Sequence, residues 1–216
     1  MRPRQTLLLG LMLLVPVLAF LFLKSFGTNH YALPTFFPER VDSTQVGGKW
    51  QRDTVYHHLN SFGLTSQSGH PEAITEIAGR GLYVAGFLCA NCPGASPEPI
   101  AQLARVQELY RQDSQVKLVT YLTAGITPEK AAEQYGAIAG KWWFLAGDSA
   151  TMRRVADDYH LSTATNSTIQ TSNLFLIDRD QQIRGIYDGT KHKEIERLLT
   201  EIGVLLYIYE HDDADR

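Results

Sequence analysis

Cys89 and Cys92 are the only two cysteines of the chain, and they lie in the stretch VAGFLCANCPG at residues 84–94. Two thiols separated by two residues can form a disulfide, exchange electrons with another disulfide, or hold a metal ion. A structural disulfide usually closes a long loop, because a long loop removes more chain entropy from the unfolded state. A loop with only two intervening residues gains little of that stabilisation. The spacing therefore favours a reactive pair, and a purely structural CxxC in a binding module is the alternative.

The elements on either side of the cysteines are predicted to be a strand and a helix. GLYVAGFL at residues 81–88 is a continuous apolar run, as expected for a strand buried on both faces. Residues 95–112 carry apolar side chains at helical spacing, with Ser96 before a proline as the start signal. The start of a helix stabilises a thiolate through its backbone N–H groups and dipole. We therefore expect Cys89 to be the attacking thiol and Cys92 the resolving one.

The rest of the chain alternates between strand and helix patterns. The order is β-α-β-α-β-α-β-β-α, which predicts an α/β fold with a central mixed sheet flanked by helices. In this frame a CxxC is typical of a thioredoxin-like redox protein. After the cysteines, the predicted strands are residues 116–122, 142–147, 173–178 and 183–189, and the predicted helices begin at Thr127, Asp148 and Lys191.

The N-terminal run TLLLGLMLLVPVLAFLFL, at residues 6–23, contains no charged residue and is long enough to span a bilayer. A cleaved signal peptide is the alternative, but the run is longer than the usual apolar core of such a peptide and offers no A-x-A-like cleavage site. Arg2 and Arg4 before the run, against Lys24 after it, predict a cytoplasmic N-terminus. We therefore expect residues 1–24 to form a signal anchor in the inner membrane, with the remainder in the periplasm.

The remaining boundaries follow from composition. Residues 25–52 are rich in Gly, Pro and polar residues and are predicted to be a tether and entry segment. Residues 53–209 form the predicted folded domain, with one or two short strands in residues 53–69. Residues 210–216 are an acidic tail. The net charge of −3 and the scattered basic residues argue against nucleic acid as a partner.

Residues 53–205 resemble the SCO/SenC family, membrane-tethered proteins of thioredoxin fold that help to assemble the binuclear copper centre of cytochrome c oxidase. DTVYHHLNSFGLTSQSG is similar to the entry hairpin of this family, and YVAGFLCANCPG lies where its cysteine loop belongs. WWFLAGDSATMRRVADDY resembles the segment after its third strand, and TSNLFLIDRDQQIRGIYDGT resembles its closing hairpin. The resemblance implies a role in the maturation of a respiratory copper centre.

The chain departs from the family pattern at the copper site. The family motif is CxxxCP, whereas this chain has CANCP, so alignment on Cys92 puts Leu88 where the first family cysteine falls. The histidine that completes the family's copper site is matched here by Gln170, and an amide is a poor ligand for Cu(I). Other histidines could substitute only if the fold brings them to the cysteines: His30, His57, His58, His160, His192 and His211.

Two functions remain open. The first is a membrane-anchored periplasmic thiol–disulfide oxidoreductase with Cys89 and Cys92 as catalytic residues and no required cofactor. By family analogy its target is a dithiol or disulfide of a cytochrome c oxidase subunit. The second is a Cu(I) metallochaperone that binds the metal through Cys89 and Cys92. Both departures from the family pattern weaken metal binding and keep a dithiol, so they favour the redox function.

Overall fold

The computed structural model describes residues 12, 14–22, 33–46, 49–161, 169 and 171–214. The chain divides into two units, Met1–Ala32 and Leu33–Arg216. In the first unit, the described residues are helical. Among the residues that the structure describes, no helix combines the length and apolar composition needed to cross a bilayer. Part of the predicted span at residues 6–23 lies outside the described residues, so the membrane anchor stays a prediction.

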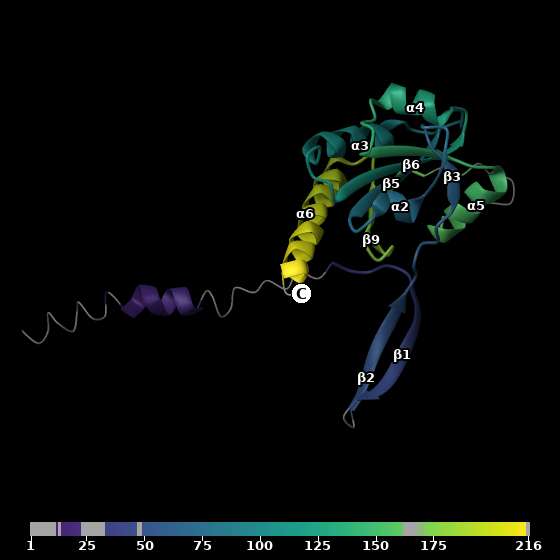
Figure 1. The fold of residues 1–216 in the computed structure, drawn as a ribbon. Helices are drawn as coiled ribbons and strands as arrows, with labels where there is room; N and C mark the ends of the chain where they lie inside the picture. Colours follow the sequence, from purple (N-terminus) through teal and green to yellow (C-terminus); the bar gives the residue numbers. More distant parts are fainter. Residues whose placement is uncertain are drawn as a thin grey trace, which may run out of the picture. The chain divides into compact units, whose positions relative to one another are not determined.

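The second unit is a sheet with helices on both of its faces (Figure 1). Its strands are β1 (Pro38–Val46), β2 (Lys49–Tyr56), β3 (Gly63–Thr65), β4 (Pro71–Ala73), β5 (Leu82–Cys89), β6 (Val116–Ala124), β7 (Trp142–Ala146), β8 (Asn173–Ile177) and β9 (Ile183–Asp188). Its helices are α2 (Ile74–Ala78), α3 (Glu98–Leu109), α4 (Pro128–Tyr135), α5 (Ser149–Asp158) and α6 (His192–Ala214).

The main sheet has the strand order β4-β3-β7-β6-β5-β8-β9. Strands β5, β6 and β7 are parallel, and β8 is antiparallel to both β5 and β9. The mixed central sheet flanked by helices is therefore confirmed, as is the antiparallel pair that closes it. The helix predicted at Thr127 is also confirmed, because Thr127 is the N-cap of α4 and a proline follows at the first helical position.

Alternation along β5 divides the core into two layers, because successive side chains of a strand point to opposite faces of the sheet. Leu82, Val84 and Leu88 pack into one layer with α3, α4 and α6. Phe87 belongs to the other layer, which α2 and α5 cover. A strand that is buried on both faces needs apolar residues at every position, which explains the continuous run in the sequence.

Three segments differ from the sequence predictions. A β1–β2 hairpin, separate from the main sheet, occupies much of the predicted tether and entry segment at residues 25–52. Its strands are mostly polar, so they lack the apolar alternation by which strands are predicted. The short elements β4 and α2 were not predicted, because a few residues show no clear period. Helix α6 continues to Ala214, into the predicted acidic tail at residues 210–216.

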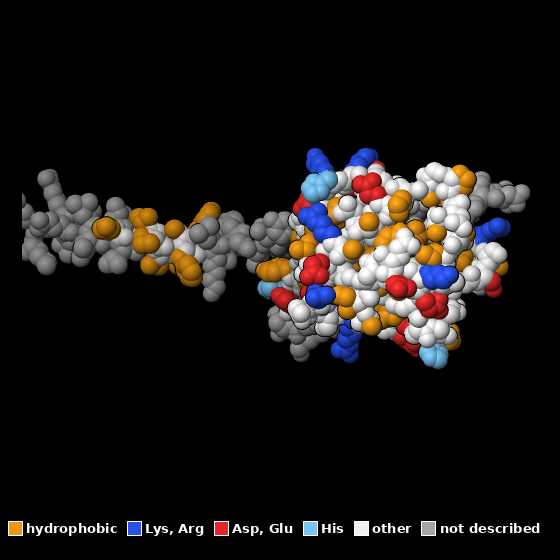
Figure 2. Space-filling view, turned by 90° about the horizontal axis from the view of Figure 1, so that it is seen from above, with side chains coloured by type: hydrophobic (Ala, Val, Ile, Leu, Met, Phe, Trp, Pro, Cys, Tyr) orange, Lys and Arg blue, Asp and Glu red, His pale blue; other side chains and the backbone are white. Residues whose placement is uncertain are grey.

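On one face of the molecule the charged side chains are mixed in sign. Figure 2 shows acidic and basic side chains interspersed on the face that it displays, rather than gathered by sign. A face of mixed sign does not create the strong single-sign field that would steer a charged ligand.

Candidate functional site

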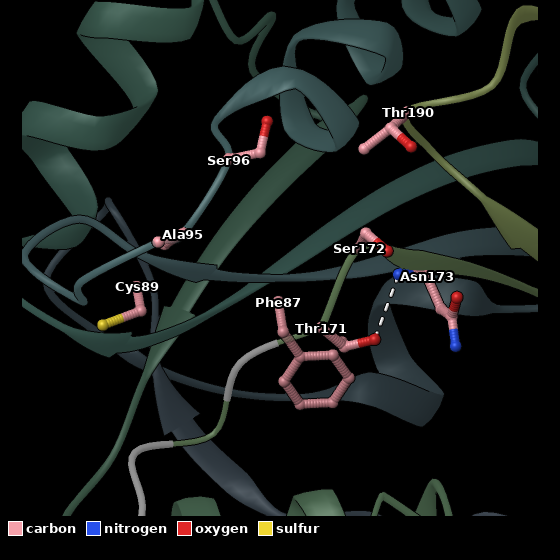
Figure 3. A pocket seen from close by; sticks show the side chains of 9 residues that line it. Phe87, Cys89, Ala95, Ser96, Thr171, Ser172, Asn173 and Thr190 are labelled. Carbon is pink, nitrogen blue, oxygen red and sulfur yellow. Dashed lines mark hydrogen bonds between the residues drawn. The ribbon is translucent and has the colours of Figure 1, made fainter.

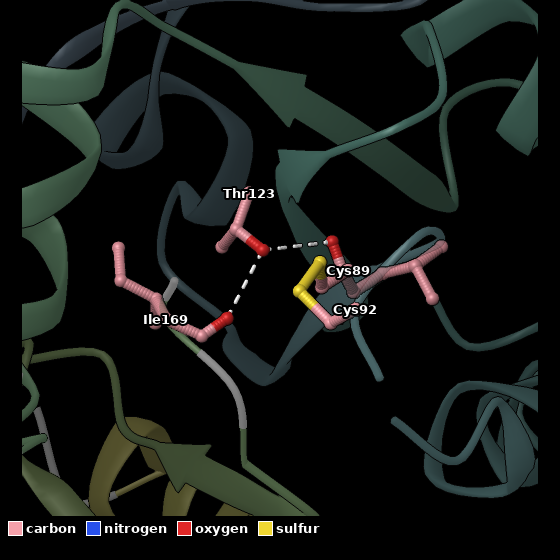
Figure 4. The surroundings of a disulfide bond; sticks show 5 residues. Cys89, Cys92, Thr123 and Ile169 are labelled. Atoms are coloured by element: carbon pink, nitrogen blue, oxygen red, sulfur yellow. Dashed lines mark hydrogen bonds between the residues drawn. A yellow bond between two sulfur atoms is a disulfide. The ribbon is translucent and has the colours of Figure 1, made fainter. Parts of the chain in front are cut away.

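The structure brings Cys89 and Cys92 together as a disulfide, with their Cα atoms 5.5 Å apart (Figure 4). Cys89 is the last residue of β5, and Cys92 lies in the turn that follows. The position of the pair at the end of a central parallel strand agrees with the sequence prediction.

The pairing of β5 with β6 changes register at Cys89, the first cysteine of the pair. Leu88 is opposite Leu122, but Cys89 is opposite Ala124, so Thr123 is an extra residue in β6. The Thr123 hydroxyl lies 3.2 Å from the Leu88 carbonyl oxygen and 3.0 Å from the carbonyl oxygen of Ile169, and its one O–H is shared between these two acceptors (Figure 4). The hydroxyl therefore ties the end of β5 to the segment before β8.

The turn between the cysteines packs closely on the loop that follows β6. The N–H of Ala90 donates to the Ala124 carbonyl oxygen at 3.0 Å. Gly125 has a φ of +89°, and a Cβ atom added there would lie 2.7 Å from the Asn91 side chain. Only glycine fits both this conformation and this close approach. The TAG stretch at residues 123–125 thus packs against the CANC turn at residues 89–92.

The two cysteines differ in exposure. Cys89 is 5% exposed, whereas Cys92 is partly exposed and lies between the exposed residues Asn91 and Pro93. The difference arises because Cys89 is paired within the sheet, while Cys92 is in a surface turn.

The expectation that the cysteines lie at the start of a helix is wrong. Helix α3 begins at Glu98, after a separate stretch that contains two prolines, Pro93 and Pro97. Ser96 does act as a start signal, because its hydroxyl accepts a hydrogen bond from the Glu98 N–H at 3.2 Å. The helix dipole acts mainly within the first turn, so it does not select Cys89 as the thiolate.

A pocket of about 560 Å³ borders the disulfide (Figure 3). It lies between the segment after β5 and the segment that leads into β8. The residues that line it are Phe87, Cys89, Gly94, Ala95, Ser96, Thr171, Ser172, Asn173 and Thr190. None of these side chains carries a charge, and the polar ones are hydroxyls and one amide.

An aromatic cluster lies behind Phe87. The ring centroid of Phe87 is 5.1 Å from that of Tyr121 and 5.3 Å from that of Tyr159. Burial raises the pKa of Tyr121, and burial together with the neighbouring tyrosines raises that of Tyr159. Both phenols are therefore protonated at neutral pH, so this side of the site is also uncharged.

Each candidate histidine that the structure describes contacts residues other than the two cysteines. Within the described residues, no three His, Cys, Asp or Glu side chains are grouped so that they could hold a metal ion. Gln170 and His30 lie outside the described residues. The contacts are His57 with Glu39 and Asp158, His58 with the carbonyl oxygen of Asp180, His160 stacked on Phe37, His192 with Glu196, and His211 with the carbonyl oxygen of Tyr207.

The fold and the disulfide together define a thioredoxin-like protein with a CxxC site at the end of a central strand. The family model SCO1/SenC matches residues 51–205, which is more than half of the chain. The chain therefore belongs to the SCO1/SenC family, as the sequence motifs indicated. No curated protein sequence matches the chain.

Solved structures of this family are similar to the chain in fold. A SCO1/SenC family lipoprotein from Bacillus anthracis is 22% identical, with a TM-score of 0.59 over 69% of this chain and 95% of that one. BsSco, a member of the Sco family of cytochrome c oxidase assembly proteins, is 16% identical, with a TM-score of 0.57 over 69% and 93%. ScoI from Bradyrhizobium japonicum, solved with copper bound, is 18% identical, with a TM-score of 0.51 over 68% and 99%.

Proposed function

We propose that this protein is a thiol–disulfide oxidoreductase that acts in the maturation of a respiratory copper centre. The observation that carries the proposal is the Cys89–Cys92 disulfide at the end of β5 in a thioredoxin-like fold. A pair that closes so short a loop contributes little stability, so reactivity is the better reason for its presence.

The chemistry is an exchange of two electrons between dithiol and disulfide. In the reduced protein, one thiolate attacks a target disulfide, forms a mixed disulfide and releases a target thiolate. The second thiolate then attacks the mixed disulfide and releases the other target thiolate. The protein becomes the Cys89–Cys92 disulfide and the target becomes a dithiol. No cofactor is needed for either step.

The proposed target is a cysteine pair of a cytochrome c oxidase subunit, which must be reduced before copper enters. Membership of the SCO1/SenC family supports this target, as does the similarity to BsSco, a member of a family of oxidase assembly proteins. The apolar run at residues 6–23 and the preceding Arg2 and Arg4 support a single-pass anchor in the inner membrane, with the domain in the periplasm.

A single-turnover assay tests the redox function. The full-length protein in detergent is reduced, freed of reductant and mixed with a synthetic peptide that contains one disulfide. We expect each reduced chain to convert one peptide disulfide to a dithiol, while the Cys89→Ser/Cys92→Ser double variant converts none. A double variant that reduces the peptide as fast as the wild type would falsify the proposal.

A second candidate function is that of a Cu(I) carrier. The observation that favours it is the position of two adjacent sulfur atoms beside a pocket, in a fold shared with a protein solved with copper bound. Two thiolates suit Cu(I), because this soft ion prefers soft ligands such as thiolates. A third ligand is not among the described His, Cys, Asp or Glu side chains, since none is grouped with the cysteines.

Titration of the reduced, full-length protein with Cu(I) against a competing chelator, without oxygen, separates the two functions. One-to-one binding that is lost in the double variant would establish the carrier function. If the protein does not compete with the chelator for Cu(I), the carrier function is excluded and the redox function remains.

A further inference from the structure

We infer that Cys92, rather than Cys89, is the sulfur that forms the mixed disulfide with the target, and that Cys89 resolves it. The inference rests on the proposed redox function and reverses the order expected from the sequence. Three features of the structure carry it: the exposure of the two cysteines, the direction of the Cys89 side chain, and the position of helix α3.

The first feature is access. A thiol–disulfide exchange requires an incoming sulfur to approach the sulfur that is attacked. Cys89 is 5% exposed, so a protein target meets little of its surface. Cys92 is partly exposed, and its neighbours Asn91 and Pro93 are exposed. A sulfur atom of a target polypeptide can therefore reach Cys92 with less rearrangement.

The second feature is the fixed orientation of Cys89. Cys89 is paired with Ala124 of β6. The N–H of the next residue, Ala90, donates a hydrogen bond to the Ala124 carbonyl oxygen at 3.0 Å. Figure 3 shows the Cys89 sulfur pointing away from Phe87 and from the wall formed by Thr171 and Ser172. The pocket thus meets the flank of Cys89, and the bond to Cys92 takes its sulfur toward the surface turn.

The third feature is the start of α3 at Glu98. The sequence argument for Cys89 took the cysteines to lie close enough to the start of the helix predicted at residues 95–112 for its positive end to stabilise a thiolate. In the structure neither cysteine lies in the first turn of that helix. Access is then the factor that distinguishes the two sulfurs.

Thiol–disulfide exchange is reversible, so the sulfur that is attacked in the oxidised protein is also the sulfur that attacks in the reduced protein. Exchange in both directions passes through the same mixed disulfide. A target thiolate that attacks the Cys89–Cys92 bond at Cys92 releases the Cys89 thiolate. In the forward direction, the Cys92 thiolate attacks the target disulfide, and the Cys89 thiolate then attacks Cys92 and releases the target as a dithiol.

Trapping of the mixed disulfide tests the order. Each full-length single variant, Cys89→Ser and Cys92→Ser, is reduced and mixed with the disulfide peptide, and the mixed disulfide is followed by mass spectrometry. We expect Cys89→Ser to accumulate the mixed disulfide at a rate near that of the wild-type reaction. We expect Cys92→Ser to form it more slowly, by a factor on the order of ten, because its remaining cysteine, Cys89, is only 5% exposed.

A second measurement needs no variant. The oxidised wild-type protein is mixed with reduced glutathione and quenched with acid, and the modified cysteine is located by peptide mapping. Glutathione on Cys92 supports the inference, whereas glutathione mainly on Cys89 overturns it. Equal trapping by the two variants, or faster trapping by Cys92→Ser, also overturns it.

The two proposals fail in different ways. If the wild-type protein reduces the peptide but the mixed disulfide is carried by Cys89, only the order of attack is wrong. If the wild-type protein neither reduces the peptide nor exchanges with glutathione, the redox function itself is wrong and the order of attack falls with it.

Discussion

Thr123 shows how one side chain can serve the cysteine site without taking part in its chemistry. It is the extra residue of β6 at the register shift beside Cys89, and its hydroxyl donates to the carbonyl oxygens of Leu88 and Ile169. Thr123→Val keeps the shape of the side chain and removes the donor. We expect it to lower the free energy of unfolding by about 1–2 kcal/mol, because a partly buried acceptor loses its hydrogen bond.

Denaturant unfolding of the oxidised protein measures this effect. Thr200→Val is the matched control, because the Thr200 hydroxyl donates to a carbonyl oxygen within α6 on an exposed surface, 2.9 Å from the oxygen of Glu196. We expect the control to change stability by less than about 0.5 kcal/mol. Equal losses in the two variants would show that the Thr123 bonds have no special part in holding the site.

At the scale of elements, the loop after β6 and the turn between the cysteines depend on their close contact at Gly125. An alanine there would place its Cβ 2.7 Å from Asn91 and would require a φ of +89°, which side chains rarely adopt. We expect Gly125→Ala to lower the free energy of unfolding by about 1–3 kcal/mol. Chemical denaturation, with the disulfide intact, gives the value.

Gly203 in α6 is the control for Gly125. It is exposed, and a Cβ added there meets no atom within 4 Å. Gly203→Ala should stabilise the protein by up to about 1 kcal/mol, because alanine favours a helix interior. If both alanine variants are stabilised, the close approach of the two loops does not constrain the CANC turn.

At the scale of the whole domain, His57 joins the base of the β1–β2 hairpin to the end of α5. Its Nδ1 is 2.7 Å from a carboxylate oxygen of Glu39 in β1, and its Nε2 is 3.1 Å from one of Asp158 in α5. Asp158 is buried and also accepts hydrogen bonds from the N–H and the side-chain amide of Asn60. The contact therefore links a hairpin outside the main sheet to a helix that covers it.

This contact makes stability depend on pH. Burial by itself would lower the pKa of His57, but the hydrogen bond to Glu39 and the charge of Asp158 outweigh it and raise that pKa. The hydrogen bond from His57 lowers the pKa of Glu39. A raised histidine pKa stabilises the folded state below the ordinary value of 6.5, and the contribution is lost as pH rises through the folded value. A lowered glutamate pKa stabilises it above 4.5, and that contribution is lost as pH falls.

We therefore expect His57→Gln to reduce the melting temperature most between about pH 4.5 and 6.5, and less as the pH rises further. Thermal unfolding of the two proteins from about pH 4.5 to well above pH 6.5 measures the difference. Glu39→Gln introduced on the His57→Gln background should add little, because the two groups act on each other. A difference between wild type and His57→Gln that stays constant with pH would contradict this account.

Local sequence patterns determined most of the elements. The continuous apolar run of β5 predicts a strand buried on both faces, and Thr127 with the following proline predicts the start of α4. Such patterns are readable because each depends on the period or the terminus of one element. Alternation along β7 likewise puts its adjacent tryptophans on opposite faces of the sheet, with Trp142 fully buried and Trp143 only partly so.

The family and the cysteine pair were likewise determined by the sequence, because CANCP and the closing hairpin are local motifs. The tertiary structure decided what surrounds that pair. It showed that α3 begins at Glu98, later than the start predicted at residue 95, that β6 has an extra residue at Thr123, and that Cys89 is more buried than Cys92. These features arise from strand register and from packing between segments far apart in the chain. No pattern within the CxxC stretch encodes them, so the order in which its two sulfurs act could be inferred only from the folded protein.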